Sequence, residues 1–239
     1  MHDGATCVCG ARDNRRCLAR VPAQVGALPR LRELTLLYCD VRTFAPLTHL
    51  TALTSVAIEG SLAVVPAELS RLTSLRSLAI ELDDAPEELD RGPLPAALPH
   101  LRRLTYLSVA GDVRIPEPPA ALACLTGLRS LQWAPRQSSA HAALPPGAWL
   151  ADLTRLEARC ELLAASLPAL AAATQLQELL VARHTGPPNG TAVERVARWA
   201  AGAASLRSIV FNGTLQLPRA GWPALLWLKG LRPQLRIET

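Results

Sequence analysis

The segment Leu31-Arg-Glu-Leu34-Thr-Leu36 has a pattern, L-x-x-L-x-L, that recurs along almost the whole chain of 239 residues. The copies begin at Leu31, Leu53, Leu75, Leu104, Leu128, Leu153, Leu176 and Leu206. Successive copies are separated by 22, 22, 29, 24, 25, 23 and 30 residues, and Leu235-Arg-Ile237 resembles the start of a ninth. A period of this length indicates a protein built from stacked repeats.

Each copy of the pattern predicts one short strand with an apolar inner face. Leu34 and Leu36 alternate with Glu33 and Thr35, so the leucines point to one side of the strand. One repeat cannot bury that face alone, whereas stacked repeats bury it in a continuous core. We therefore expect an α/β fold, a right-handed solenoid with a parallel concave sheet of about eight strands and helical or irregular convex segments.

Proline opens several of the segments that return from one strand to the next. Examples are Val21-Pro22, Val65-Pro66 and Leu94-Pro95. Proline suits the first position of a helix, because the N–H group that it lacks would have no partner inside the helix there. Short helical turns are therefore expected after these prolines, on the convex side of the sheet.

The repeats and their proline-opened returns resemble the leucine-rich-repeat family over about residues 18–237. They look most like its plant and algal intracellular type, similar to Ras-suppressor and SHOC-type proteins. The resemblance implies a protein-binding scaffold in the cytoplasm, with the cytoskeleton, the ciliary axoneme or a signalling complex as its setting. The family usually has Asn three residues after the last strand leucine, but Arg136 and Glu161 occupy that position in two repeats. We expect irregular turns at both.

Three segments are expected along the chain. Residues 1–17 form a poorly ordered N-terminal segment, residues 18–217 hold the repeats, and residues 218–239 form a C-terminal capping segment. The last segment contains the apolar run from Trp222 to Leu228. This run is interpreted as a capping helix over the last repeat, with partner docking or a longer parent protein as alternatives. We expect a monomer unless this segment mediates association.

Composition argues against two classes of partner. The net charge of +5 is spread along the chain and only 4% of residues are aromatic, whereas nucleic-acid binding requires a basic stripe with stacking aromatic side chains. No apolar run approaches the ~20 residues that span a membrane, so we expect neither nucleic-acid binding nor membrane insertion. The first thirty residues contain no apolar run of the kind found in signal peptides, which favours an intracellular location.

The cysteines and histidines do not predict catalysis. Cys7, Cys9 and Cys17 are interpreted as plain thiols, with a disulfide cap or a zinc site as alternatives that their spacing suits poorly. His49 and His100 lie in return segments and are expected on the convex surface. The sequence shows no nucleophile elbow, phosphate-binding loop or metal-spaced cluster. We therefore expect no enzyme activity, no cofactor and no metal.

The outward strand positions are the predicted binding face. Glu33, Glu59 and Glu81 make its first half acidic, whereas Arg155 and Arg159 are expected to add positive charge further along. Small residues between them leave a smooth surface on which a partner can lie close. The residues predicted to contact the partner are Glu59, Glu81, Tyr106, Gln132, Arg155, Glu157 and Arg159.

These observations predict a non-catalytic interaction scaffold that holds a protein partner on its concave face. One alternative is the ligand-sensing region of an immune or receptor-type signalling protein, which would be joined to a nucleotide-binding or kinase domain. Another is a substrate adaptor for ubiquitin ligation. An adaptor would need an F-box-like helical segment before the repeats, for which residues 1–20 are too short.

Overall fold

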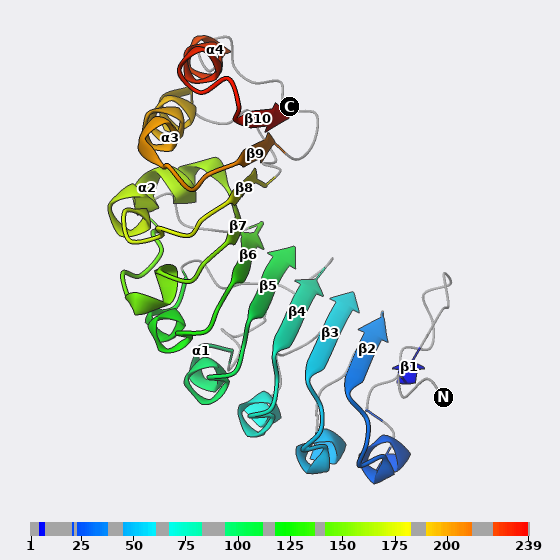
Figure 1. The fold of residues 1–239 in the computed structure, drawn as a ribbon. Coiled ribbons are helices and arrows are strands. Elements are labelled where there is room, and N and C mark those ends of the chain that lie inside the picture. The colour runs from blue at the N-terminus through cyan, green and yellow to red at the C-terminus, as the bar shows by residue number, and fades with distance from the viewer. Residues whose placement is uncertain are drawn as a thin grey trace.

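A computed structural model describes residues 5–7, 21, 23–37, 45–60, 67–82, 94–111, 118–136, 142–182, 190–211 and 222–238. Within these ranges ten strands form one sheet, in which every strand pairs in parallel with its neighbours in the chain. The strands line the inside of an arc and the helical segments follow its outside (Figure 1). The strands are β1 (Ala5–Cys7), β2 (Glu33–Leu37), β3 (Ser55–Gly60), β4 (Ser77–Leu82), β5 (Tyr106–Gly111), β6 (Ser130–Pro135), β7 (Arg155–Ala158), β8 (Glu178–Val181), β9 (Ser208–Phe211) and β10 (Arg236–Glu238).

The predicted parallel sheet is confirmed, and it is longer than the eight strands that the repeats indicated. β10 contains Ile237, which ends the partial ninth copy of the pattern. At the other end, β1 pairs with β2, although we expected residues 1–17 to be poorly ordered. The rest of that segment, with Cys9 and Cys17, lies outside the described residues.

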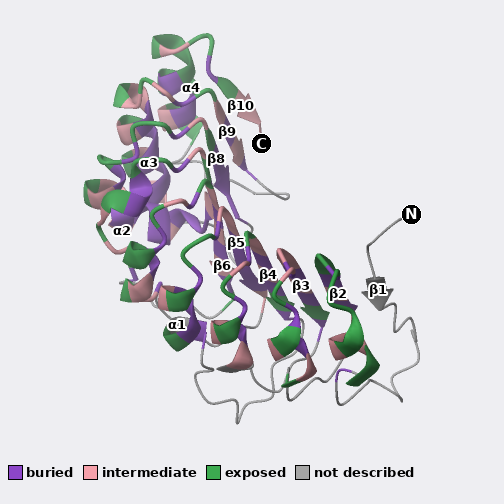
Figure 2. Ribbon diagram, turned by 60° about the horizontal axis from the view of Figure 1, so that its bottom comes forward, coloured by how far each residue is buried: buried purple, intermediate pink, exposed green. Residues whose placement is uncertain are grey.

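The inward strand positions form a continuous core between the sheet and the convex layer, where buried residues are concentrated (Figure 2). Strand pairing aligns Leu78 of β4 with Val56 of β3 and Leu107 of β5, and all three side chains are fully buried. The same alignment brings the equivalent residue of every repeat from Leu34 to Ile237 into one row. The alternation that the sequence predicted therefore produces the core.

Backbone hydrogen bonds at the start of the strands hold neighbouring repeats in register. The N–H groups of Arg76 and Ser77 both donate to the carbonyl of Thr54, at 2.8 and 3.0 Å. The equivalent pair recurs at each junction from β2–β3 to β8–β9. At three junctions a threonine hydroxyl adds a further bond to the carbonyl of the preceding repeat, as Thr54 Oγ1 does to Arg32 at 3.1 Å.

The convex segments change along the chain from short 3₁₀ helices to α-helices. The 3₁₀ helices η1 and η3 begin directly after Pro22 and Pro66, and His49 and His100 are exposed as predicted. The described elements before residue 160 are η1 (Ala23–Ala27), η2 (Ala45–His49), η3 (Ala67–Arg71), α1 (Leu94–Ala97), η4 (Leu98–His100), η5 (Ala120–Cys124) and η6 (Ala148–Leu150). Those from residue 160 onward are α2 (Cys160–Leu170), α3 (Gly190–Gly202) and α4 (Trp222–Leu231). None of the helices in the described ranges is long and apolar enough to cross a bilayer.

Arg232 connects the C-terminal segment to the preceding repeat. Its guanidinium donates to the carbonyls of Ala200, Ala203 and Leu206 at 2.9, 2.6 and 2.8 Å. Carbonyls at the end of a helix have no partner inside the helix, and a basic side chain can satisfy them. The segment thus contains the expected helix, α4, packed against α3, and also the strand β10.

Candidate functional site

The pairing register arranges the outward side chains of the sheet in three rows that cross the strands. The first row is Glu33, Ser55, Ser77, Tyr106, Ser130, Arg155, Glu178, Ser208 and Arg236. The second row is Thr35, Ala57, Ala79, Ser108, Gln132, Glu157, Leu180, Val210 and Glu238. The third row is Leu37, Glu59, Glu81, Ala110 and Ala134. These rows form the concave face.

The N-terminal half of the concave face is acidic. Glu59 and Glu81 are directly paired on β3 and β4, both are exposed, and Glu33 is exposed on β2. Paired residues on neighbouring strands lie only ~4.8 Å apart in the backbone, so the two carboxylates present a concentrated negative charge. No outward position of β2–β6 in these rows is basic.

Small side chains make up the middle of the face. Ala57 and Ala79 occupy the second row on β3 and β4, where a partner can approach close to the sheet. On β5 and β6, Ser108 Oγ and Gln132 Oε1 are hydrogen-bonded at 2.8 Å. Tyr106 is half-buried in the first row. Its ring is the largest side chain on this part of the face and borders the small residues.

The exposed Arg155 is paired within the face and is not a free positive charge. Its Nη1 lies 3.1 Å from Glu178 Oε2 on the next strand, with the two side chains 48% and 49% exposed. Glu157, on the same strand, is half-buried and pairs in register with Gln132. The sequence therefore identified these outward positions, whereas the ion pair with Glu178 neutralises the charge that we expected Arg155 to offer.

Arg159 does not lie on the concave face, and the expected exposure of this residue is wrong. β7 ends at Ala158, and Arg159 is the N-cap residue of α2, with only 8% of its surface exposed. Its Nη1 and Nη2 atoms donate to the carbonyl of Arg136 at 3.1 and 2.8 Å, whereas its Nε atom is buried without a partner. Desolvation by burial lowers the pKa of Arg159, against the opposing effect of Glu161.

The two bonds from Arg159 end at a position where the sequence departs from the expected asparagine. Arg136, at the asparagine position, lies in a bend, and its carbonyl accepts both bonds from Arg159. The rest of the turn expected there, residues 137–141, lies outside the described residues. The turn expected at Glu161 is absent, because that residue lies in the first turn of α2. In the sequence, only the absence of asparagine at position 136 indicated that a donor from elsewhere in the chain bonds to the backbone here.

The described residues contain no cluster of three or more His, Cys, Asp or Glu side chains that could hold a metal ion. Cys160 is buried, and desolvation, with a smaller effect from Glu161, raises the pKa of its thiol from 9.0 to about 12. A protonated thiol is a poor nucleophile. Cys124 is the exposed thiol of η5.

Comparisons with known proteins add structural likeness at low sequence identity. No protein-family model matches the chain, and no curated protein is significantly similar to it. An internalin C2 from Listeria monocytogenes is 15% identical, with a TM-score of 0.48 over 84% of this chain and 80% of that one. The internalin inlF from the same organism is 15% identical, with a TM-score of 0.44 over 92% and 70%.

The third comparison is with the leucine-rich-repeat ectodomain of the plant membrane receptor kinase GASSHO1/SCHENGEN3 from Arabidopsis thaliana, solved in complex with Casparian strip integrity factor 2. It is 17% identical, with a TM-score of 0.42 over 92% of this chain and 28% of that one. The assignment of the fold rests on this chain itself. Its in-phase L-x-x-L-x-L repeats and its parallel sheet define a leucine-rich-repeat solenoid.

Proposed function

We propose that this chain is a non-catalytic scaffold that binds a protein partner on its concave face. The observation that carries the proposal is the directly paired and exposed Glu59 and Glu81 beside a row of small side chains. In this arrangement a basic segment of the partner meets the carboxylates, and its backbone lies over the alanines of the second row.

The remaining predicted contacts have different roles in this proposal. Tyr106 and Gln132 border the acidic half and offer an aromatic surface and an amide. Arg155 and Glu157 lie further along, where Arg155 is already bonded to Glu178. Charge complementarity at such a face determines orientation and the rate of association more than affinity. The partner is to be sought in the cytoplasm, including the cytoskeleton and the ciliary axoneme that the resemblance implies.

Reversal of the paired charges tests the proposal. The variant Glu59→Lys/Glu81→Lys is expected to bind the partner about tenfold more weakly or worse, a change of ~1.4 kcal/mol for each tenfold. Because both side chains are exposed, the melting temperature should change little. The partner is first identified by affinity capture with mass spectrometry, and its binding is then measured by calorimetry at low and high salt. The loss should shrink at high salt, because salt screens exposed charges.

The matched control is His49→Glu/His100→Glu, which changes two exposed side chains on the convex side. These substitutions should leave binding unchanged. If they weaken binding while the reversal of Glu59 and Glu81 does not, the partner sits on the convex side and the proposal fails.

A further inference from the structure

The last helix in the described residues, α4, exposes large apolar side chains. Trp222 is 43% exposed, Leu226 68%, Trp227 47% and Leu231 57%. Exposed apolar patches usually mark a contact surface. We therefore expect another surface to cover these exposed side chains of α4.

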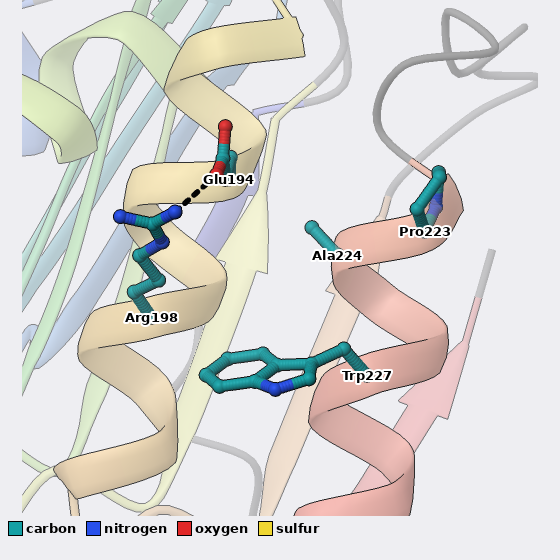
Figure 3. A pocket seen from close by; sticks show the side chains of 5 residues that line it. All are labelled: Glu194, Arg198, Pro223, Ala224 and Trp227. Carbon is teal, nitrogen blue, oxygen red and sulfur yellow. Dashed lines mark hydrogen bonds and ion pairs between the residues drawn. The ribbon is translucent and has the colours of Figure 1, made fainter.

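One side of α4 faces α3. The Trp227 ring points toward α3 across a groove of about 540 Å³, whose lining includes the ion-paired Glu194 and Arg198 (Figure 3). Pro223 and Ala224 complete the lining from α4. This side is thus directed at a neighbour within the same chain.

A second side of α4 is turned away from α3. With 3.6 residues per turn, the buried Leu225 and Leu228 define the side toward the core, and Trp227 defines the side toward α3. Trp222 and Leu226, four residues apart, share the remaining side. Gly230 follows Leu226 by one turn, and a methyl group added there would stand in open space. Lys229 also lies beside Trp222 on this side, where its ammonium group donates to the carbonyls of Pro233 and Leu235 at 3.0 and 2.7 Å. The rest of this side is apolar and leaves room for a second helix to approach.

The strand next to α4 also lacks a neighbour. In the described part of the chain, β10 pairs with β9 alone. Its residues Arg236 and Glu238 lie in the outward rows, and Ile237 aligns with the core residue Ile209. An edge strand carries unpaired backbone N–H and C=O groups that can pair with another strand.

We propose that two copies of this chain join end to end through β10 and α4, around a two-fold axis at Ile237. Antiparallel pairing about Ile237 places Arg236 of each copy opposite Glu238 of the other, so the three-residue strand is complementary to itself. Residues directly opposite each other on antiparallel strands are close enough for such charges to attract.

The same axis brings the helices together. A two-fold axis perpendicular to the sheet keeps both copies of α4 on the convex side, where Trp222 and Leu226 of each copy meet those of the other. Joining the two ends head to tail would instead place β10 beside β1, whose residues Ala5–Cys7 offer no charges to match Arg236 and Glu238. Head-to-tail contacts also produce open filaments, whereas a two-fold contact closes. The concave face stays free in the dimer.

Charge exchange at β10 is the decisive experiment. The unchanged chain should show a concentration-dependent mass of twice one chain in sedimentation equilibrium. Arg236→Glu alone and Glu238→Arg alone should each weaken the dimer about tenfold or more, because like charges then lie opposite each other. A mixture of the two single variants should form a heterodimer, which native mass spectrometry distinguishes by chain mass.

The mixture separates the contact between copies from the ion pair that Arg236 and Glu238 form within one strand. That ion pair is lost in both single variants, so attraction in the mixture can come only from the second chain. A monomer at every concentration, a series of ever larger oligomers, or a mixture that associates no better than its components would each overturn the proposal.

A second pair of variants tests the helix contact. Leu226→Glu places a charge on the side of α4 turned away from α3 and should weaken the dimer about tenfold or more, because the charge is desolvated there. Leu231→Glu makes the same change at a similarly exposed position, on the side of Trp227, and should leave the dimer intact. If Leu231→Glu dissociates the dimer and Leu226→Glu does not, α4 does not pack as proposed.

Discussion

Arg159 shows how a single side chain can connect two repeats. Its guanidinium is buried against the carbonyl of Arg136, and hydrogen bonds to charged groups contribute more than neutral ones. Arg159→Ala leaves that carbonyl without its donors and should lower the free energy of unfolding by about 2 kcal/mol. Urea denaturation followed by circular dichroism measures the difference.

Arg155→Ala is the matched control for this prediction. Arg155 is half-exposed and its partner Glu178 is equally accessible to water. Surface ion pairs contribute less than ~1 kcal/mol, so this variant should remain close to the unchanged chain. Equal losses in the two variants would mean that the Arg159 bond contributes no more than a surface contact.

The two described free cysteines should differ in reactivity. Native Cys160 should resist a thiol reagent at mildly alkaline pH, because burial raises the pKa of its thiol to about 12. The exposed Cys124 should react. The unfolded chain loses the Cys160 proton near the ordinary pKa of 9.0, whereas the native chain keeps it until about pH 12. The stability that depends on the protonated thiol is therefore complete below about pH 9 and is lost as the pH rises from 9 to 12. Peptide mapping by mass spectrometry assigns the modified residues, and rapid labelling of Cys160 in the folded chain would contradict the prediction.

Among the secondary-structure elements, the strands from β2 to β10 could be predicted from the sequence, whereas β1 contains no copy of the repeat pattern. Period-two alternation places Leu34 and Leu36 inward and Glu33 outward in any strand that packs on one face. Because the repeats are in phase, the same reasoning aligned Glu59 with Glu81 one strand apart, and the pairing register agrees. The acidic half of the candidate face therefore followed from the repeats.

The convex segments and the end of β7 were harder to predict. The interval from Leu153 to Leu176 is among the shorter ones, yet it contains the 11-residue helix α2, because that helix begins directly after the strand. If β7 continued by one residue, Arg159 would occupy an outward position of the strand. The strand instead ends at Ala158, and the long arginine side chain turns back to the preceding repeat. Such a contact depends on tertiary packing and leaves no periodic signal.

At the scale of the whole molecule, the two proposed contact surfaces lie in different parts of the chain. The exposed Glu59 and Glu81 lie in the N-terminal half of the sheet, whereas the exposed apolar side chains Leu226 and Trp227 lie on the last helix. A basic partner bound at these carboxylates and a second copy of the chain bound at α4 would not compete for the same surface. The repeats thus connect two surfaces through one continuous core.

The continuity of that core leads to a prediction about cooperative unfolding. Leu78 is fully buried and aligned with core residues on both sides, so Leu78→Asp would leave an unpaired carboxylate between two repeats. Such a change costs about 4 kcal/mol or more, a large part of the 5–15 kcal/mol that typically stabilises a domain. Repeats are stabilised by their neighbours, so a break at β4 removes support in both directions, and Leu107→Asp should do the same from β5.

We expect both variants, Leu78→Asp and Leu107→Asp, to lose the cooperative thermal transition in circular dichroism. Ala79→Asp, one residue along on the outward face, should keep it, and a normal transition in either leucine variant would show that these strands do not share one core.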